Sequence, residues 1–202
     1  AIYEASTVNP WIKIRDFKIR NHSLNTALPS WEVIKDVPAS TNNSSVFECS
    51  DLNNPRTVEI RFWRLRHSGA HGRCYIRLGP SSGYINSGYN DIGTHMAHNS
   101  SNPTVVRSFN QGQWTPFTDD FTNSTNYYSG SILIRRISNP GNNTRFIMES
   151  HLVVDYDSGN TQYFINVNGQ MTFANNHPLD QLKFYHDSST INYGDIQFLA
   201  QH

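Results

Sequence analysis

The most informative pattern along the chain is an alternation of apolar and polar residues with a period of two. It is clearest in residues 56–66, where Val58, Ile60 and Phe62 are apolar and the charged Glu59 and Arg61 stand between them. Because successive side chains of a β-strand point to opposite faces of a sheet, this alternation predicts a strand with one buried face.

Similar runs, separated by turn residues, recur along most of the chain. Strands are predicted over residues 11–19, 31–37, 45–49, 56–66, 73–79, 131–137, 144–156, 161–167, 179–186 and 194–200. Residues 67–72 are predicted to form a hairpin loop, and the Asn168-Gly169 step suits a type I′ turn. Residues 80–93 are rich in turn residues, and residues 94–129 are the least regular part of the chain.

No segment combines helix caps with a period of 3.6 residues. Short strands joined by polar turns predict an all-β chain, an antiparallel β-sandwich of jelly-roll-like type. The composition agrees, because 12% of the residues are aromatic and only 16% are charged, against about 25% charged in typical soluble domains. The missing charge is replaced by polar turn residues.

The chain is predicted to have two parts. Its 202 residues are enough for one large domain with an appended element. The first strand is followed by a polar stretch that contains a proline. We therefore expect residues 1–30 to form an N-terminal arm or anchoring strand and residues 31–202 to form the β-sandwich domain.

Charge and hydropathy argue against two classes of partner. The 16 acidic and 16 basic residues give a formal net charge of zero, whereas proteins that wrap nucleic acid carry a strong basic excess. No stretch approaches the roughly 20 apolar residues of a membrane helix, and the N-terminus has no apolar signal core. We expect neither nucleic acid nor a membrane as a partner.

Neither metal binding nor a disulfide framework is expected. His95 and His98 have a spacing used by metal ligands, but their glycine, asparagine and serine surroundings favour a polar loop. Cys49 and Cys74 lie in strand-like runs, and buried free thiols are favoured over a disulfide between them. No cofactor is predicted.

The acidic residues do not predict an enzyme. Asp119 and Asp120 are adjacent, so a regular strand would point them to opposite faces rather than across one cleft. Asp155 and Asp157 share a face, but they lead into a turn that explains them more simply. The chain has no nucleophile elbow and no phosphate-binding glycine loop.

Aromatic residues in the irregular segments are the best binding candidates. Aromatic side chains on the loops of a sandwich often contact sugars or proteins. The alternative is that these side chains pack over the ends of the sandwich as plugs. The candidates for ligand or receptor contact are Tyr84, Tyr89, Trp114 and Phe117, with Tyr127 and Tyr128 beside them.

A run of arginines accompanies two further aromatic residues, Trp63 and Tyr75. Interleaved basic and aromatic residues are typical of single-stranded nucleic-acid binding. With zero net charge, we favour an outer face or sheet edge whose arginines meet carboxylates of a neighbouring subunit or prevent strand-to-strand aggregation. The arginines are Arg61, Arg64, Arg66, Arg73 and Arg77.

Three longer segments carry a recognisable order of strands and turns. Residues 45–91 read SVFECSDLNNPRTVEIRFWRLRHSGAHGRCYIRLGPSSGYINSGYND, residues 127–150 read YYSGSILIRRISNPGNNTRFIMES, and residues 179–200 read LDQLKFYHDSSTINYGDIQFLA. Together they resemble the β-sandwich modules of bacteriophage virion proteins, found in tail fibres and in head decoration or head-fibre proteins. The resemblance covers roughly residues 31–200. The chain ends this pattern with Leu199-Ala200 where the modules usually have Tyr-Gly.

The resemblance implies a location in the virion, a jelly-roll-like sandwich and an oligomer, often a trimer. It implies a structural or host-recognition role and supplies no active-site residues. It also suggests that the arm adds a strand to the edge of another subunit. The candidate assembly contacts of the arm are Trp11, Ile12, Ile14, Phe17 and Ile19.

Three hypotheses follow. The leading one is a non-enzymatic virion structural protein, made in the host cytoplasm, that assembles as a homo-oligomer, with a trimer favoured, on other capsid or tail proteins. The alternative is a host receptor- or carbohydrate-binding tail protein whose partner is a surface glycan. The third is a sugar-processing enzyme or a secreted lectin unrelated to phages.

Overall fold

A computed structural model of the chain describes residues 30–38, 43–69, 72–97, 102–117, 126–138, 143–156, 163–173 and 177–202. The chain divides into two compact units, Ala1–Ser30 and Trp31–His202, and the fold below is that of the second unit. The strand predicted over residues 11–19 and the arm contacts predicted within it lie outside the described residues.

The described residues form strands and no helix. The strands are β1 (Glu32–Val37), β2 (Val46–Cys49), β3 (Thr57–His67), β4 (Cys74–Gly79), β5 (Tyr89–Ala97), β6 (Thr104–Gln111), β7 (Asn126–Ser138), β8 (Thr144–Tyr156), β9 (Tyr163–Phe173), β10 (Gln181–His186) and β11 (Ile191–Gln201). No helix among these residues has the length and apolar character of a membrane span.

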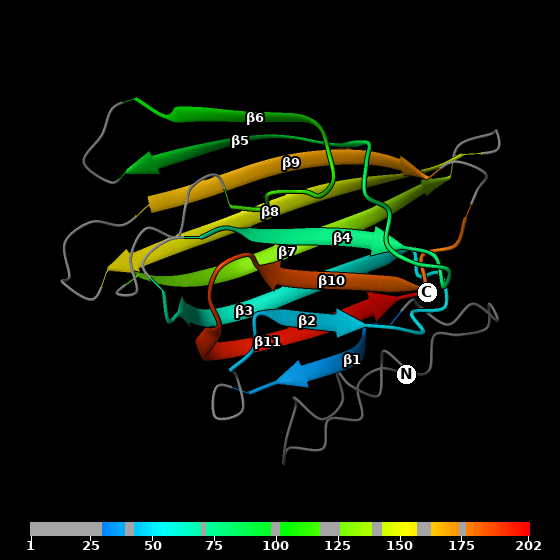
Figure 1. Cartoon of the computed structure of the whole chain (residues 1–202), viewed down its shortest axis with the longest axis horizontal. Coiled ribbons are helices and arrows are strands. Elements are labelled where there is room, and N and C mark those ends of the chain that lie inside the picture. Colours follow the sequence, from blue (N-terminus) through cyan, green and yellow to red (C-terminus); the bar gives the residue numbers. More distant parts are fainter. Residues whose placement is uncertain are drawn as a thin grey trace, which may run out of the picture. The chain divides into compact units, whose positions relative to one another are not determined.

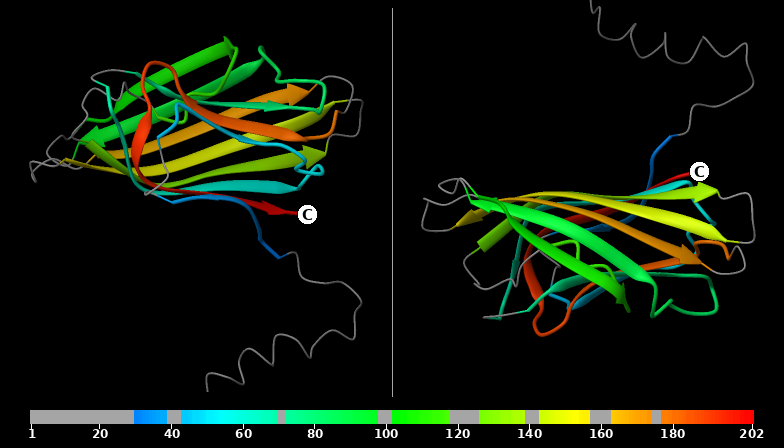
Figure 2. Two further views of the ribbon diagram at one scale, coloured as in Figure 1. Left: turned by 60° about the horizontal axis from the view of Figure 1, so that its bottom comes forward. Right: turned by 90° about the horizontal axis from the view of Figure 1, so that it is seen from above.

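The strands build two antiparallel sheets that lie face to face (Figure 1 and Figure 2). The large sheet has eight strands in the order β1-β11-β3-β7-β8-β9-β5-β6, and the small sheet has three in the order β2-β10-β4. From β1 to β4, and again from β9 to β11, each connection changes sheet. The predicted all-β antiparallel sandwich is confirmed, and this alternation gives it a jelly-roll-like order.

A single residue extends the small sheet beyond β4. The backbone of Trp114 forms an isolated bridge with Ile76, in which each N–H donates to the other carbonyl at 3.0 Å. The bridge brings the segment after β6 under the large sheet. The Asp91 carboxylate, which is buried, accepts a hydrogen bond from the Thr115 N–H at 3.0 Å and holds the same segment to β5.

The core lies between the two sheets and is rich in aromatic rings. The ring of Phe62 on β3 stacks on the ring of Phe184 on β10, with centroids 6.3 Å apart. Phe117 approaches Phe184 edge-on at 6.2 Å and also contacts Phe62. All three side chains are buried or almost so. Phe62 points into the core, as the alternation predicts, and aromatic rings from both sheets contact one another at this point.

Two predicted turns are wrong. Residues 67–72 do not close a hairpin, because β3 and β4 lie in different sheets. Asn168-Gly169 is not a turn, because β9 continues through it and Asn168 pairs with strands on both sides. Gly169 has a packing role instead: a Cβ atom there would lie 2.7 Å from the indole nitrogen of Trp114. The segment predicted to be least regular, residues 94–129, contains the last four residues of β5, all of β6 and the start of β7.

The two cysteines are free and buried, as predicted. β10 lies between the strands that carry them, and Cys49 and Cys74 face opposite ends of it. Burial raises the pKa of the Cys49 thiol to about 11, with Lys35 acting against this shift. Burial also raises the pKa of Cys74. Both thiols therefore pack as small apolar groups.

A histidine pair joins the two sheets at one end of the core. The rings of His67 on β3 and His186 on β10 are stacked, with centroids 4.8 Å apart, and both side chains are buried. The Ser189 hydroxyl lies 3.2 Å from Nδ1 of His67 and 3.1 Å from Nδ1 of His186. The backbone N–H groups of Ser188 and Ser189 donate to Nδ1 of His186, which favours a neutral ring with its proton on Nε2.

Acid is expected to destabilise the fold through His186. Burial lowers the pKa of His186 below its ordinary value of 6.5, while Asp187 acts in the opposite direction. Below about pH 6.5 the unfolded chain binds a proton at His186 that the folded chain does not. The free energy of unfolding therefore decreases as the pH is lowered, until the pH passes the folded-state pKa. Urea titrations between about pH 7.5 and 5 measure this slope.

The His186→Phe variant keeps a stacked ring and removes the titrating group, so its stability should depend less on pH than that of the unmodified protein. His202→Gln is the matched control, because His202 is exposed at the end of the chain. An unchanged slope in His186→Phe would show that acid acts through other groups.

Candidate binding groove

The outer face of the large sheet, turned away from the small sheet, carries a continuous row of polar side chains. The strands β1, β11, β3, β7, β8, β9 and β5 lie side by side in this order, and each contributes one residue to the row, directly opposite the residue of the next strand. In spatial order the row is Asp36, Gln197, Arg61, Ser131, His151, Asn166 and Thr94. Directly opposite residues of neighbouring strands share a face, so these side chains form one surface.

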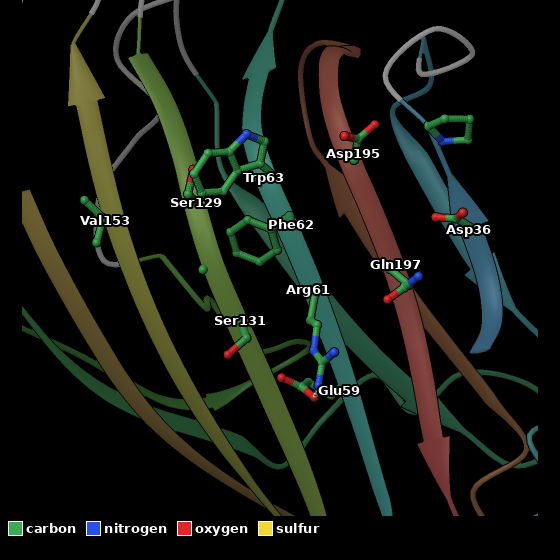
Figure 3. A pocket seen from close by; sticks show the side chains of 12 residues that line it. Asp36, Glu59, Arg61, Phe62, Trp63, Ser129, Ser131, Val153, Asp195 and Gln197 are labelled. Atoms are coloured by element: carbon green, nitrogen blue, oxygen red, sulfur yellow. Dashed lines mark hydrogen bonds and ion pairs between the residues drawn. The ribbon is translucent and has the colours of Figure 1, made fainter. Parts of the chain in front are cut away.

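A groove of about 890 Å³ opens on this face, across β1, β11, β3, β7 and β8 (Figure 3). Its volume lies within the roughly 300–1,000 Å³ typical of ligand sites. It is lined by Asp36, Pro38, Glu59, Arg61, Phe62, Trp63, Ser129, Gly130, Ser131, Val153, Asp195 and Gln197.

Trp63 is the main aromatic side chain at the surface of the groove. It is 64% exposed, and its backbone pairs with that of Asp195 on β11. In Figure 3 the indole lies over β3 and β7 next to Ser129, with Asp195 on the neighbouring strand. A single exposed apolar side chain is ordinary on a soluble protein, so Trp63 is of interest because it lines a groove together with carboxylate, amide and hydroxyl side chains.

The position of Trp63 results from irregularities on two neighbouring strands. On β3 the register with β7 shifts between Phe62 and Leu65, and Arg64 has a positive φ of 52°. The Arg64 N–H leaves the ladder and donates to the Ser129 hydroxyl at 3.0 Å. On β11 the register with β3 shifts on both sides of Tyr193, and Gly194 has a φ of 94°. Such bulges bend a strand and redirect its side chains.

The groove has a floor of small residues on β7. Ser129, Gly130 and Ser131 present little side-chain volume between Trp63 and Val153. Gly130 has a φ of 150°, and a Cβ atom there would lie 2.1 Å from the carbonyl oxygen of His151. Only glycine fits this position without movement of β8. The hollow therefore depends on local sequence in β7 as well as on the bulges.

Carboxylates dominate the charge of the groove. Its lining contains three carboxylates and one guanidinium, which gives a formal charge of −2. Nη2 of Arg61 lies 2.7 Å from Oε2 of Glu59, and the hydrogen bond from Arg61 to Glu59 raises the pKa of Arg61. The guanidinium is thus paired within the protein, and the three carboxylates of the lining can only accept hydrogen bonds.

A cluster of arginine and tyrosine side chains borders the groove. The guanidinium carbon of Arg64 lies 4.3 Å from the centre of the Tyr127 ring. Arg66 lies over the rings of Tyr127 and Tyr193, and its Nη1 donates to the Tyr127 hydroxyl at 3.1 Å. These cation–π contacts link β3, β7 and β11 where the bulges occur. Arg64 and Arg66 thus contact aromatic rings of their own chain.

Tyr84 lies on the other sheet. Lys183 Nζ is 4.5 Å from the centre of its ring, and the Tyr84 side chain hydrogen-bonds with Glu48. Burial, followed by Glu48, raises the pKa of Tyr84 to about 12. The ring is half-buried, and Lys183 lies over one face, so Tyr84 is engaged by its own chain at the outer surface of the small sheet.

The structure corrects the expectation for three aromatic candidates. Tyr89, Trp114 and Phe117 are exposed by 0%, 0% and 1%, and a ligand at the surface cannot reach them. The Tyr89 hydroxyl accepts a hydrogen bond from the Leu78 N–H at 2.8 Å. These side chains, with the buried Tyr128, fill the sandwich, as the plug alternative describes. Tyr127 is also buried, but it lies outside this core, under Arg64 and Arg66.

The remaining predicted chemistry is scattered or lies outside the described residues. His95 packs edge-on against Tyr163, with ring centroids 6.0 Å apart. Within the described ranges, no group of three or more histidine, cysteine, aspartate or glutamate side chains is placed to hold a metal ion. His98, Asp119, Asp120 and Asp157 lie outside those ranges.

The sequence pattern places Trp63 on an arginine-rich outer face and does not mark it as a ligand contact. The available signal was its place in the alternation of β3: Phe62 points inward, so Trp63 has to point outward. The bulge that positions Trp63 leaves no comparable signal, because Arg64 is an ordinary strand residue by type.

A second surface lies at the far edge of the large sheet, on β9, β5 and β6. Met96 pairs directly with Phe164, and Val105 pairs with Thr94. We call the exposed apolar side chains here the apolar edge patch. It consists of Ile92, Met96, Val105, Phe109 and Phe164, with exposures of 45%, 44%, 51%, 66% and 43%.

Comparison of the chain with protein-family models, curated proteins and solved structures finds no match. The resemblance to phage virion modules therefore stays a prediction that rests on the quoted segments.

Proposed function

We propose that this chain is a non-enzymatic structural protein of a bacteriophage virion, a surface decoration or fibre module that assembles as an oligomer on the capsid or tail. The order of the three quoted segments supports the virion assignment. The antiparallel sandwich is the fold that this assignment implies. The apolar edge patch is the observation that supports assembly most directly.

The apolar edge patch lies on the end of a sheet that is open to a partner. β6 is the last strand of the large sheet, and no described strand pairs with its outer edge. Its side chains are mostly exposed, including Val105 and Phe109. Edge strands with exposed apolar residues pair readily with other chains unless they are protected. A second copy or a neighbouring virion protein that packs here buries the apolar side chains and can extend the sheet.

Assembly is tested first by location and mass. We expect many copies of the chain in purified particles, measured by gel densitometry, and a stable oligomer of the purified protein in light scattering. A homotrimer is the favoured state. A protein that is monomeric at all concentrations and absent from particles contradicts the proposal.

The Phe109→Glu variant tests the apolar edge patch itself. A charge placed in a packed apolar interface stays unpaired on burial. We therefore expect the dissociation constant of the oligomer to rise on the order of tenfold or more over that of the unmodified protein. Val46→Glu is the matched control, because Val46 is 41% exposed on the small sheet. Circular dichroism checks that both variants fold. Dissociation by Val46→Glu alone would place the interface elsewhere.

A further inference from the structure

We propose that the Trp63 groove is a binding site for neutral oligosaccharides. The proposal concerns a different surface from the apolar edge patch and does not depend on the assembly role. It rests on the exposed indole, on the acceptors beside it and on the charge of the groove.

The indole supplies a flat apolar surface that is available without rearrangement. Trp63 is 64% exposed, and the small floor residues Ser129 and Ser131 leave space beside it. The C–H face of a pyranose ring packs on an aromatic face in the same way as other apolar groups, and tryptophan offers the largest such area. A sugar ring seated there covers apolar area that water now contacts.

The neighbouring side chains suit a ligand that donates hydrogen bonds. Asp195 is paired with Trp63 in the ladder, and Gln197 is paired with both Arg61 and Asp36. Ionised carboxylates only accept hydrogen bonds, whereas an amide both donates and accepts. Sugar hydroxyls do both as well, so they satisfy this set, and their bonds to carboxylates are of the stronger charge-assisted kind.

The charge of the groove selects among polar ligands. The three carboxylates of the lining outnumber its one guanidinium, and they disfavour sulfated and sialylated glycans and nucleic-acid phosphates next to the indole itself. The positive charges of Arg64 and Arg66 lie at the border, over tyrosine rings. An amphipathic peptide helix needs a continuous apolar groove, whereas charged and polar side chains, seven of the twelve lining residues, interrupt the apolar surface of this one. A neutral glycan fits both the charge and the polarity.

The site is held rigidly before any ligand binds. The Arg64 N–H bond to Ser129 and the contact of Arg64 with Tyr127 fix the bulge next to Trp63. Gly194 and Gly130 allow the adjacent strands to follow the same bend. A pre-organised site loses less conformational entropy on binding. Several copies of the chain in one assembly would raise a weak single-site affinity by avidity.

The experiment applies the full chain to an array of neutral homo-oligosaccharides of hexoses and N-acetylhexosamines beside sulfated and sialylated oligosaccharides. Titration of the best neutral oligosaccharide in solution then gives the affinity of a single site. We expect at least one neutral class to bind and the charged glycans to bind more weakly. Absence of neutral binding, or stronger binding of the charged glycans, overturns the proposal.

Substitutions assign the binding to the groove. We expect Trp63→Ala to weaken the solution affinity on the order of tenfold or more, Trp63→Phe to retain part of it, and Asp195→Asn to weaken it. Trp31→Ala is the matched control, because Trp31 is 39% exposed and does not line the groove. Equal binding by Trp63→Ala and the unmodified protein overturns the proposal. The Phe109→Glu variant should keep the single-site affinity, so failure of assembly and failure of glycan binding are distinguishable.

Discussion

Replacement of Trp114 with alanine is expected to lower the free energy of unfolding by about 3–5 kcal/mol, the usual cost of removing a large buried aromatic side chain. Trp114 is fully buried and meets the Tyr89 ring edge-on, with centroids 5.3 Å apart. Its indole N–H donates to the Gln170 carbonyl at 3.3 Å, and its backbone forms the bridge to Ile76. Trp114 thus lies between the two sheets, with its side chain against β5 and β9 and its backbone bonded to β4, so the cavity left by the side chain opens between them.

Thermal or urea unfolding measures this effect. For a chain of this length the loss corresponds to a fall in melting temperature on the order of 10 °C. Trp63→Ala is the matched control: the same residue type at an exposed position should change stability by no more than about 0.5 kcal/mol. Similar losses in the two variants would mean that Trp63 is packed as tightly as Trp114.

The fold class was predictable because one-sided burial leaves a direct mark on the sequence. On β3, Val58, Ile60 and Phe62 point into the core in strict alternation, as predicted. On β9 the same alternation continues to Phe173, but the Asn168-Gly169 step resembled a turn. That glycine is there because Trp114, far away in the sequence, occupies the space of a side chain. Local turn signals cannot reveal a requirement set by a distant residue.

The assignment of strands to sheets was not predictable in the same way. An apolar strand face looks alike in either sheet, so residues 67–72 were interpreted as a hairpin loop although they connect two sheets. β6 was missed because its position at the sheet edge leaves Val105 and Phe109 exposed and gives no alternating burial. Alternation of apolar and polar residues marks strands that cover a core on one face, and strands that extend beyond the core lack this signal.

The candidate site, like the fold, was only partly predictable from the sequence. Aromatic residues in irregular segments were expected at the surface. Trp114 is instead a core residue because its segment packs beneath the large sheet, and Tyr89 is one because it begins β5 and its side chain belongs to the core. The exposed aromatic residue, Trp63, lies on the most regular predicted strand. Its side-chain direction followed from the alternation, whereas the groove around it depends on register shifts in β3 and β11. Those shifts arise from pairing between strands and leave no pattern in one strand alone.

The paired bulges also identify the backbone position on which the groove depends most. Gly194 lies on β11 with a φ of 94°, and a Cβ atom there would lie 2.5 Å from the Arg64 carbonyl oxygen and 2.6 Å from the Leu65 nitrogen. Both of these are backbone atoms, so a side-chain rotation cannot relieve the contact. Arg64 itself has a positive φ. The two strands approach each other closely only because one of them has no side chain at this point.

Gly194→Ala is therefore expected to cost on the order of 2–4 kcal/mol, from backbone strain together with the contact on Arg64. Gly88→Ala is the matched control: Gly88 has a φ of 81° but nothing within 4 Å of an added Cβ, so only the strain, about 1 kcal/mol, should remain. Urea unfolding measures both losses. Because separation of β3 from β11 shifts Trp63, Gly194→Ala should also change the tryptophan fluorescence of the folded protein, and Gly88→Ala should not. Equal losses in the two variants would show that β3 and β11 separate freely at the bulge, and the rigidity inferred for the groove would then be wrong.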